Sequence, residues 1–127
     1  MFQEKIKKIR NYLFSDENVV FAYCFGDYLK DIGYKNAILH VALYMNKKIS
    51  FSEIISIQGL LSSKFYENLN LEILSNDIDR MNPILLYELL SDGLILFIKN
   101  QKIYDLWIIG ALNYLFDTRQ IREIINV

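Results

Sequence analysis

The 127-residue sequence holds one cysteine, one proline and one histidine. Cys24 has no second cysteine for an intrachain disulfide and lies in an apolar stretch, so we expect a small core residue in a reducing, cytoplasmic compartment. His40 has no further His or Cys with which to build a zinc site, and we expect a core or partly exposed histidine there. No nucleophile–histidine–acid arrangement is apparent, so neither a zinc domain nor a covalent hydrolase is indicated.

Neither a surplus of one charge nor a long hydrophobic run is present. Lys and Arg number 14 and Asp and Glu 15, for a formal net charge of −1, which gives no basic footprint for nucleic acid. A small basic cluster near the start lies on one face of an amphipathic segment and predicts a solvated helix face: Lys5, Lys7, Lys8 and Arg10. No apolar run approaches the ~20 residues of a membrane helix, and the first residues lack a small-residue cleavage site, so we expect neither a membrane span nor a signal peptide.

Hydrophobic residues make up 53% of the chain and charged residues 23%, which is typical of a globular protein. With no linker or repeat, we expect a single domain over 1–127. Helical and strand-like patterns alternate, which favours an α/β or α+β fold. Helices are expected over 2–14, from a cap at Ser50 or Ser52, from Asn82–Pro83 to Gly93, and from 103 to about 116, and strands over 19–25, 37–45, 69–74 and 94–98.

The stretch from Val19 to Tyr44 has the pattern strand, glycine turn, short loop, strand. It resembles the minimal nucleotidyltransferases of the DNA polymerase beta type, in which the first strand ends in Gly-Ser and the second carries two aspartates one residue apart. Here the Gly-Ser is Gly26-Asp27, and the paired aspartates fall on Ala37 and Leu39.

Later parts of the chain extend this resemblance. The strand that opens with the family's third aspartate begins here at Asn70, the helix–glycine–strand block corresponds to Glu88–Phe97, and the aromatic-Asp-Thr tail corresponds to Tyr114–Arg119. In this order they indicate the antitoxin-like branch of the family. The resemblance implies a nucleotidyltransferase-like mixed sheet of about four strands flanked by helices, with an apolar C-terminal helix.

The family's reaction requires two Mg²⁺ ions held by carboxylates, which offset the charge of ATP. No Asp or Glu occurs from Ile32 through Ser52, so no shift of register supplies the paired carboxylates. Glu72 shares a strand face with Asn70, but one carboxylate cannot build a two-metal site. Asp27 adds negative charge where the triphosphate would lie. We therefore expect no catalytic residue, no metal and no nucleotide cofactor.

The C-terminal helix is apolar nearly all round. It is either sunk in the core or contributes to an interface, and a chain of this length has little room to cover a helix on every side. Its expected interface residues are Tyr104, Trp107, Ile108 and Tyr114.

Three functional hypotheses follow. The first is a catalytically inactive relative that acts by protein–protein binding; the resemblance implies a HEPN-domain toxin, a ribonuclease, as its partner. The alternative is an active nucleotidyltransferase that transfers AMP to such a partner, using Mg²⁺ and ATP with rearranged ligands drawn from Asp27, Asp31 and Glu72. The third is a ligand-sensing or structural homo-oligomer built on the C-terminal helix.

Overall fold

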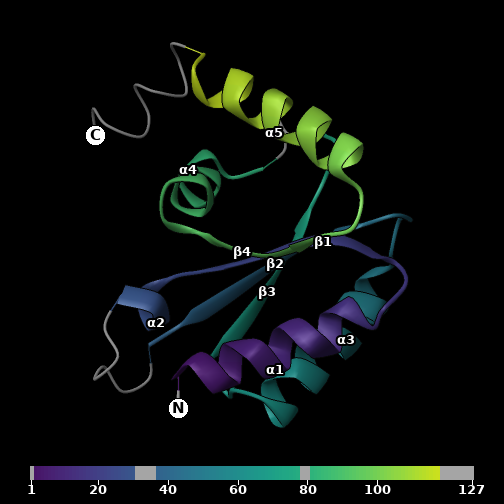
Figure 1. Cartoon of the computed structure of the whole chain (residues 1–127), viewed down its shortest axis with the longest axis vertical. Coiled ribbons are helices and arrows are strands. Elements are labelled where there is room, and N and C mark those ends of the chain that lie inside the picture. The colour runs from purple at the N-terminus through teal and green to yellow at the C-terminus, as the bar shows by residue number, and fades with distance from the viewer. Residues whose placement is uncertain (1, 31–36, 78–80, 118–127) are drawn as a thin grey trace.

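The computed structural model describes residues 2–30, 37–77 and 81–117, which form one layer of sheet between two layers of helices (Figure 1). In Figure 1, α1 and α3 lie below the sheet, α4 and α5 lie above it, and the short α2 lies at one end. The elements in chain order are α1 (Phe2–Phe14), β1 (Val19–Phe25), α2 (Asp27–Lys30), β2 (Leu39–Met45), α3 (Phe51–Lys64), β3 (Leu69–Leu74), α4 (Pro83–Asp92), β4 (Leu94–Ile98) and α5 (Gln101–Leu115).

The sheet has four strands in the order β3-β2-β1-β4. β1 pairs antiparallel with both β2 and β4, whereas β2 and β3 run parallel and are joined by α3. The mixed, helix-flanked sheet expected from the sequence is confirmed.

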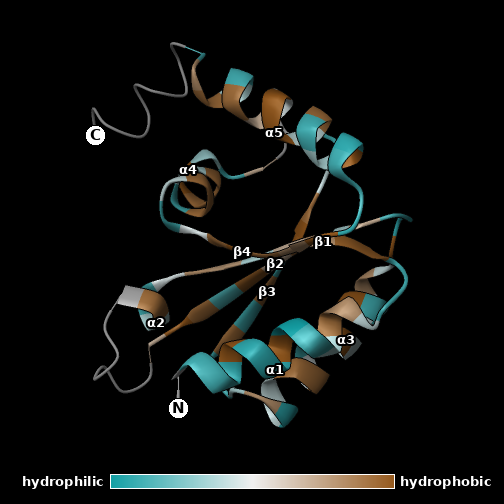
Figure 2. Ribbon diagram, viewed as in Figure 1, coloured by the Kyte–Doolittle hydropathy of each residue, from teal (hydrophilic) through white to brown (hydrophobic). Residues whose placement is uncertain are grey.

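Each face of the sheet carries its own core, because successive strand residues point to opposite faces. On the α1–α3 face, Leu39 packs in a cluster with Ile9 and Leu61. On the α4–α5 face, Phe21 packs with Trp107 in a second cluster. Figure 2 shows the hydrophobic residues concentrated along the strands and on the helix sides that face them.

Cys24 is fully buried in the α1–α3 cluster, as expected of a small core residue. Burial raises the pKa of its thiol to about 12. The thiol is therefore protonated at neutral pH, as suits a buried core residue.

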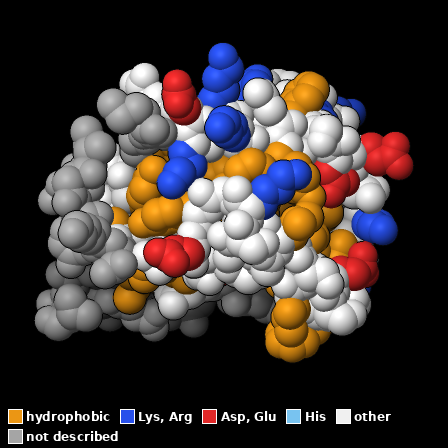
Figure 3. All heavy atoms as spheres, turned by 90° about the horizontal axis from the view of Figure 1, so that it is seen from below, with side chains coloured by type: hydrophobic (Ala, Val, Ile, Leu, Met, Phe, Trp, Pro, Cys, Tyr) orange, Lys and Arg blue, Asp and Glu red, His pale blue; other side chains and the backbone are white. Residues whose placement is uncertain are grey.

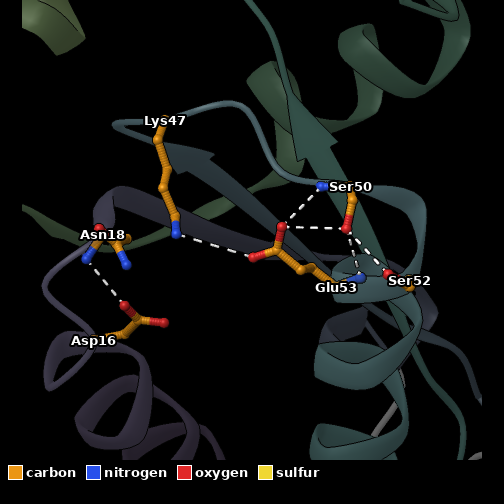
Figure 4. Close-up of polar contacts among 6 residues, drawn as sticks. All are labelled: Asp16, Asn18, Lys47, Ser50, Ser52 and Glu53. Carbon is orange, nitrogen blue, oxygen red and sulfur yellow. Dashed lines mark hydrogen bonds and ion pairs between the residues drawn. The ribbon is translucent and has the colours of Figure 1, made fainter.

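The helix starts follow their side-chain caps. Ser50, not its rival Ser52, caps α3: its Oγ accepts from the Glu53 N–H at 3.2 Å, and the Glu53 carboxylate accepts from the Ser50 N–H at 3.1 Å (Figure 4). Asn82 caps α4 by accepting from the Ile84 N–H at 2.9 Å, with Pro83 as the first helical residue. Both capping patterns were visible in the sequence.

Three boundaries differ from the sequence-based expectation. The loop after Gly26 begins with one helical turn, α2, and β2 begins at Leu39, two residues late. α5 begins at Gln101 because the Asn100 side chain accepts from the Ile103 N–H at 3.1 Å, a cap that the sequence analysis overlooked. Thr118 and Arg119 of the expected tail lie outside the described residues.

Both outer strands have edge groups bonded by side chains. On β3, the Gln58 amide donates to the Leu69 carbonyl at 2.5 Å and accepts from the Leu71 N–H at 2.6 Å. On β4, Arg10 Nε donates to the Leu96 carbonyl at 2.9 Å. Such bonds occupy groups that would otherwise pair with another chain.

In the described ranges, every helix is too short or too polar to cross a membrane.

Candidate functional site

A glycine turn at one end of the sheet forms the base of the candidate site. Gly26 follows β1 with φ +116°, in the region that L side chains rarely adopt. A Cβ at Gly26 would lie 2.7 Å from the Ile38 carbonyl oxygen and 3.0 Å from His40 Cδ2. The turn is thus held tightly against the start of β2, and the Tyr28 N–H donates to the Ile38 carbonyl at 3.2 Å.

The structure corrects the positions assigned to the paired aspartates. Ala37 and Leu39 are 2% and 0% exposed, and Leu39 packs in the α1–α3 core. The residues that open beside the Gly26 turn are Ile38, which is 48% exposed, and His40, whose ring stacks on Phe25 at 4.8 Å between centroids. The sequence-based register was one residue off, and in a strand a shift of one residue exchanges the two faces.

Asn70 does lie at the site, together with the one carboxylate that β3 supplies. Parallel pairing sets Asn70 opposite His40. Asn70 Nδ2 donates to Glu72 Oε2 at 2.7 Å and lies 3.3 Å from His40 Nδ1, while His40 Nδ1 lies 3.7 Å from Glu72 Oε2. These three side chains, the Glu72 cluster, satisfy one another.

The Glu72 cluster does not fit the two-metal chemistry that the sequence resemblance implies. Mg²⁺ prefers oxygen ligands, above all carboxylates. At this end of the sheet Ile38 offers no donor, the His40 imidazole is a poor ligand for a hard cation, and Glu72 already accepts from Asn70. Within residues 2–30, 37–77 and 81–117, no group of three or more His, Cys, Asp or Glu side chains lies where it could hold a metal ion.

The other acidic candidates are not drawn into the cluster. Asp27 is exposed in the first turn of α2. Asp31 lies outside the described residues. Glu72 is therefore the one sequence-predicted acid among the described residues that the structure places beside His40 and Asn70.

Two adjoining cavities open beside the Glu72 cluster. The first, of about 430 Å³, extends from Phe25 and Glu72 to the start of α4. The second, of about 520 Å³, continues along the loop after β2 to Ile103. The stretch Ile73–Ser75 borders both, so the cavities form one hollow along the end of β3.

The expected interface residues of α5 are mostly turned inward. Trp107 is 2% exposed, packs in the α4–α5 core and donates from Nε1 to the Ser75 carbonyl at 3.2 Å. Tyr104, Ile108 and Tyr114 are half-buried against the same cluster. Trp107 therefore stabilises the fold, whereas an interface at α5 stays a prediction.

Other apolar side chains that the sequence analysis did not single out are exposed. They lie on the outer face of α5 and at the start of α3. The spacing of Leu106, Ile109 and Phe116 opposite Trp107 would have identified the outer stripe of α5. The exposed apolar residues of these two helices include Phe51, Ile55, Leu106, Ile109, Leu112 and Phe116.

The fold is shared with solved toxin–antitoxin complexes. The MNT antitoxin bound to the tri-AMPylated HEPN toxin of Shewanella oneidensis is similar to this chain with a TM-score of 0.71 and 17% identity, covering 98% of this chain and 95% of that one. The MntA–HepT complex gives a TM-score of 0.69 at 15% identity, covering 97% and 94%. A toxin–antitoxin structure with AMP-PNP gives a TM-score of 0.70 at 15% identity, covering 95% and 94%.

No family model and no curated protein sequence matches the chain. At these identities, the likeness to the solved structures shows a common fold. The resemblance to minimal nucleotidyltransferases is therefore confirmed for the fold, over nearly the whole length of the chain.

Proposed function

We propose that this chain is an antitoxin-like protein that neutralises a HEPN-domain toxin by binding it, without transferring AMP. The fold supports the partner, because structures that share it over nearly their whole length are MNT antitoxins in complex with HEPN toxins. The lone, deeply buried thiol of Cys24 fits an assembly in the cytoplasm.

The Glu72 cluster is the single observation that carries neutralisation by binding. A working site of this fold needs carboxylates beside the glycine turn, and here Ile38, His40 and Asn70 face that position. Removing one electrostatic group from an active site typically costs a factor of ~10²–10³ in rate, and here the whole metal-binding set is replaced.

We expect a HEPN-domain protein to be encoded beside this chain, and the test is co-expression of the two. We expect growth to be rescued and the two proteins to co-purify, with the toxin's ribonuclease activity suppressed. Suppression should persist when the purified proteins are mixed without ATP. Toxicity that persists although both proteins are expressed and folded would contradict the proposal.

The alternative, an enzyme with rearranged ligands, is favoured by one observation: Glu72 lies at the site, and Asp27 opens α2 at the adjoining turn. The variants Glu72→Gln and Asp27→Asn separate the two functions. Binding alone predicts that both variants still neutralise the toxin, with Glu17→Gln as a surface control. Loss of neutralisation in a folded Glu72→Gln protein, together with calorimetric binding of Mg²⁺–ATP to the wild type, would establish the alternative.

A further inference from the structure

The outer edge of β3 is only half occupied. The Leu39 N–H donates to the Asn68 carbonyl at 3.1 Å, so alternate β3 residues, beginning with Asn68 and Asn70, direct their backbone groups toward β2. The residues between them, Leu69 and Leu71, direct theirs outward, where the Gln58 amide binds the Leu69 carbonyl and the Leu71 N–H.

The same alternation turns the N–H and the C=O of Ile73 outward, beyond the reach of the Gln58 bonds. Neither group has a hydrogen-bond partner among residues 2–30, 37–77 and 81–117. One outward N–H and one outward C=O on a single strand residue are the pair of groups that an added strand requires.

On one side of Ile73 lies an apolar stripe of α3. Gln58 contacts the β3 edge, and Ile55 and Phe51 continue the same helix face toward the start of α3. α3 runs antiparallel to β2 and β3. A helix rises about 1.5 Å per residue and a strand about 3.3 Å per residue, so the length of helix from Gln58 back to Phe51 matches the length of β3 from its Gln58 contacts to Ile73. Phe51 therefore lies level with Ile73. Phe51 is 76% and Ile55 is 53% exposed.

Figure 3 shows the α1–α3 side of the molecule, where hydrophobic side chains reach the surface among Lys and Arg side chains. Exposed aromatic and branched aliphatic side chains beside an open strand edge form a ready surface for a further strand.

On the other side of Ile73 lies the hollow formed by the two cavities. The Ile73 side chain packs against the α1–α3 cluster, yet Ile73 borders both cavities, which places its strand edge at their rim. Met81 and Leu85 line the first cavity, and Ile103 lines the second. Side chains on alternate positions of an added strand would enter this hollow, and those between them would cover Phe51 and Ile55.

We propose that an extended segment of the protein partner pairs with β3 at Ile73 and becomes a fifth strand of the sheet. This inference rests on the proposed function for the partner's identity. The occupant's class follows from the edge: backbone groups select a backbone, and apolar surfaces on both sides select a segment with apolar residues on both faces. A nucleotide would leave Phe51 and Ile55 uncovered.

The decisive variant is Ile73→Pro. Proline removes the outward N–H and leaves the bonds between β3 and β2 intact, because proline is tolerated on edge strands where the N–H faces solvent. Ile73→Ala is the matched control, since it loses the same packing and keeps the N–H. Phe51→Ser/Ile55→Ser tests the edge without altering the backbone, with Leu60→Ser, at a side chain that is 44% exposed, as a control elsewhere on α3. Thermal unfolding establishes that each variant is folded.

Two probes are applied to the isolated full chain: a phage-displayed library of random twelve-residue peptides, and the HEPN-domain protein that the proposed function expects as partner. We expect enriched peptides with alternating apolar residues. Their Kd should rise about tenfold or more for Ile73→Pro relative to Ile73→Ala, and likewise for the Phe51/Ile55 variant relative to Leu60→Ser. Binding of the HEPN-domain protein should weaken in the same two variants.

Absence of enriched peptides, or peptides that bind Ile73→Pro as tightly as Ile73→Ala, would overturn the inference. So would a wild-type dimer in light scattering that Ile73→Pro dissociates, because a second copy would then occupy the edge. If the HEPN-domain protein binds these variants as tightly as the wild type, the inference that it pairs with the β3 edge is wrong, and the proposed function is unaffected. Peptide binding without a HEPN complex would overturn the proposed function and leave an edge that pairs with extended polypeptide.

Discussion

His40, Asn70 and Glu72 lie beside the glycine turn, where the sequence resemblance implies metal-binding carboxylates. Three carboxylates without a metal repel one another, whereas an imidazole, an amide and one carboxylate can hydrogen-bond without any ion, as Asn70 does here with Glu72 at 2.7 Å and with His40 at 3.3 Å. This end of the sheet is therefore stabilised by side-chain hydrogen bonds that need no bound cation.

The corrected register makes a direct prediction about neighbouring residues. Ile38→Asp should change the free energy of unfolding by less than about 1 kcal/mol, because that side chain already reaches solvent. Leu39→Asp should cost roughly 4 kcal/mol or more, because it places an unpaired charge in the α1–α3 core. Urea denaturation measures both, and the reverse order of stabilities would restore the sequence-based register.

The two glycines at Gly26 and Gly59 should respond oppositely to alanine. Gly26→Ala should lower stability by about 1–3 kcal/mol, since its φ is positive and the new Cβ would meet the Ile38 carbonyl at 2.7 Å. Gly59→Ala should raise stability by about 0.5–1 kcal/mol, because the helical site is open and alanine favours helix. Thermal and urea unfolding of the two variants test this; a Gly26→Ala protein as stable as the wild type would contradict the tight turn.

Glu53 makes a small part of the stability depend on pH. The Ser50 N–H, then the Ser50 hydroxyl and the Lys47 ammonium, hold the pKa of its carboxyl below the ordinary value. A folded pKa below the unfolded one contributes stability that is present above the unfolded pKa and is lost as pH falls through the folded pKa.

The free energy of unfolding of the wild type should therefore fall as the pH drops below the ordinary pKa of a glutamate. In Glu53→Gln this fall should be smaller. Urea unfolding measured at several pH values, with Glu17→Gln as the control outside the capping box, checks it. An unchanged slope in Glu53→Gln would show that the capping contacts do not shift this titration.

Among the elements, α3 has two roles, since it joins the parallel strands and also bonds the β3 edge through Gln58. Gln58→Ala should cost about 1–2 kcal/mol, because the Leu71 N–H loses its partner and the Leu69 carbonyl keeps only the longer bond from the Ser62 hydroxyl at 3.3 Å. Hydrogen exchange should show a faster Leu71 amide, while Ser56→Ala on the same helix leaves it unchanged. Continued protection of the Leu71 amide in Gln58→Ala would show that another group bonds this edge.

Elements with local signals were predictable from sequence. Ser50 with Glu53 and Asn82 with Pro83 predicted their helices, because caps act on backbone groups within three residues. The faces of strands and helices were harder to assign. Trp107 is one of several apolar residues on α5, and only the position of the sheet decides that it is buried while Leu106 is exposed.

The register at the candidate site was missed for a related reason. Gly26 and the lack of acids from Ile32 through Ser52 were visible in the sequence. Two features decide whether Leu39 or His40 faces the site: the length of the connection after Gly26 and the pairing of β1 with β2. In that pairing, Phe25 lies opposite His40. Neither follows from apolar periodicity, because β2 is hydrophobic on both faces.

At the scale of the whole molecule, the chain shares the fold of the MNT antitoxin in the solved complex over nearly its full length, and its sequence from Ile32 through Ser52 carries no Asp or Glu. The strand order and the helix layers are stabilised by two apolar cores that do not involve the Glu72 cluster. The fold therefore does not depend on that cluster, and under the proposed function the exposed edges and apolar surfaces are the parts that bind the partner.

The most direct test of binding without AMP transfer is the intact mass of the HEPN-domain partner after incubation with this chain, ATP and Mg²⁺. The ribonuclease activity of the same sample is measured in parallel. We expect suppressed ribonuclease activity with the partner's mass unchanged, and the same suppression without ATP. A partner that gains the mass of one or more AMP groups, with suppression that depends on ATP, would contradict the proposed function.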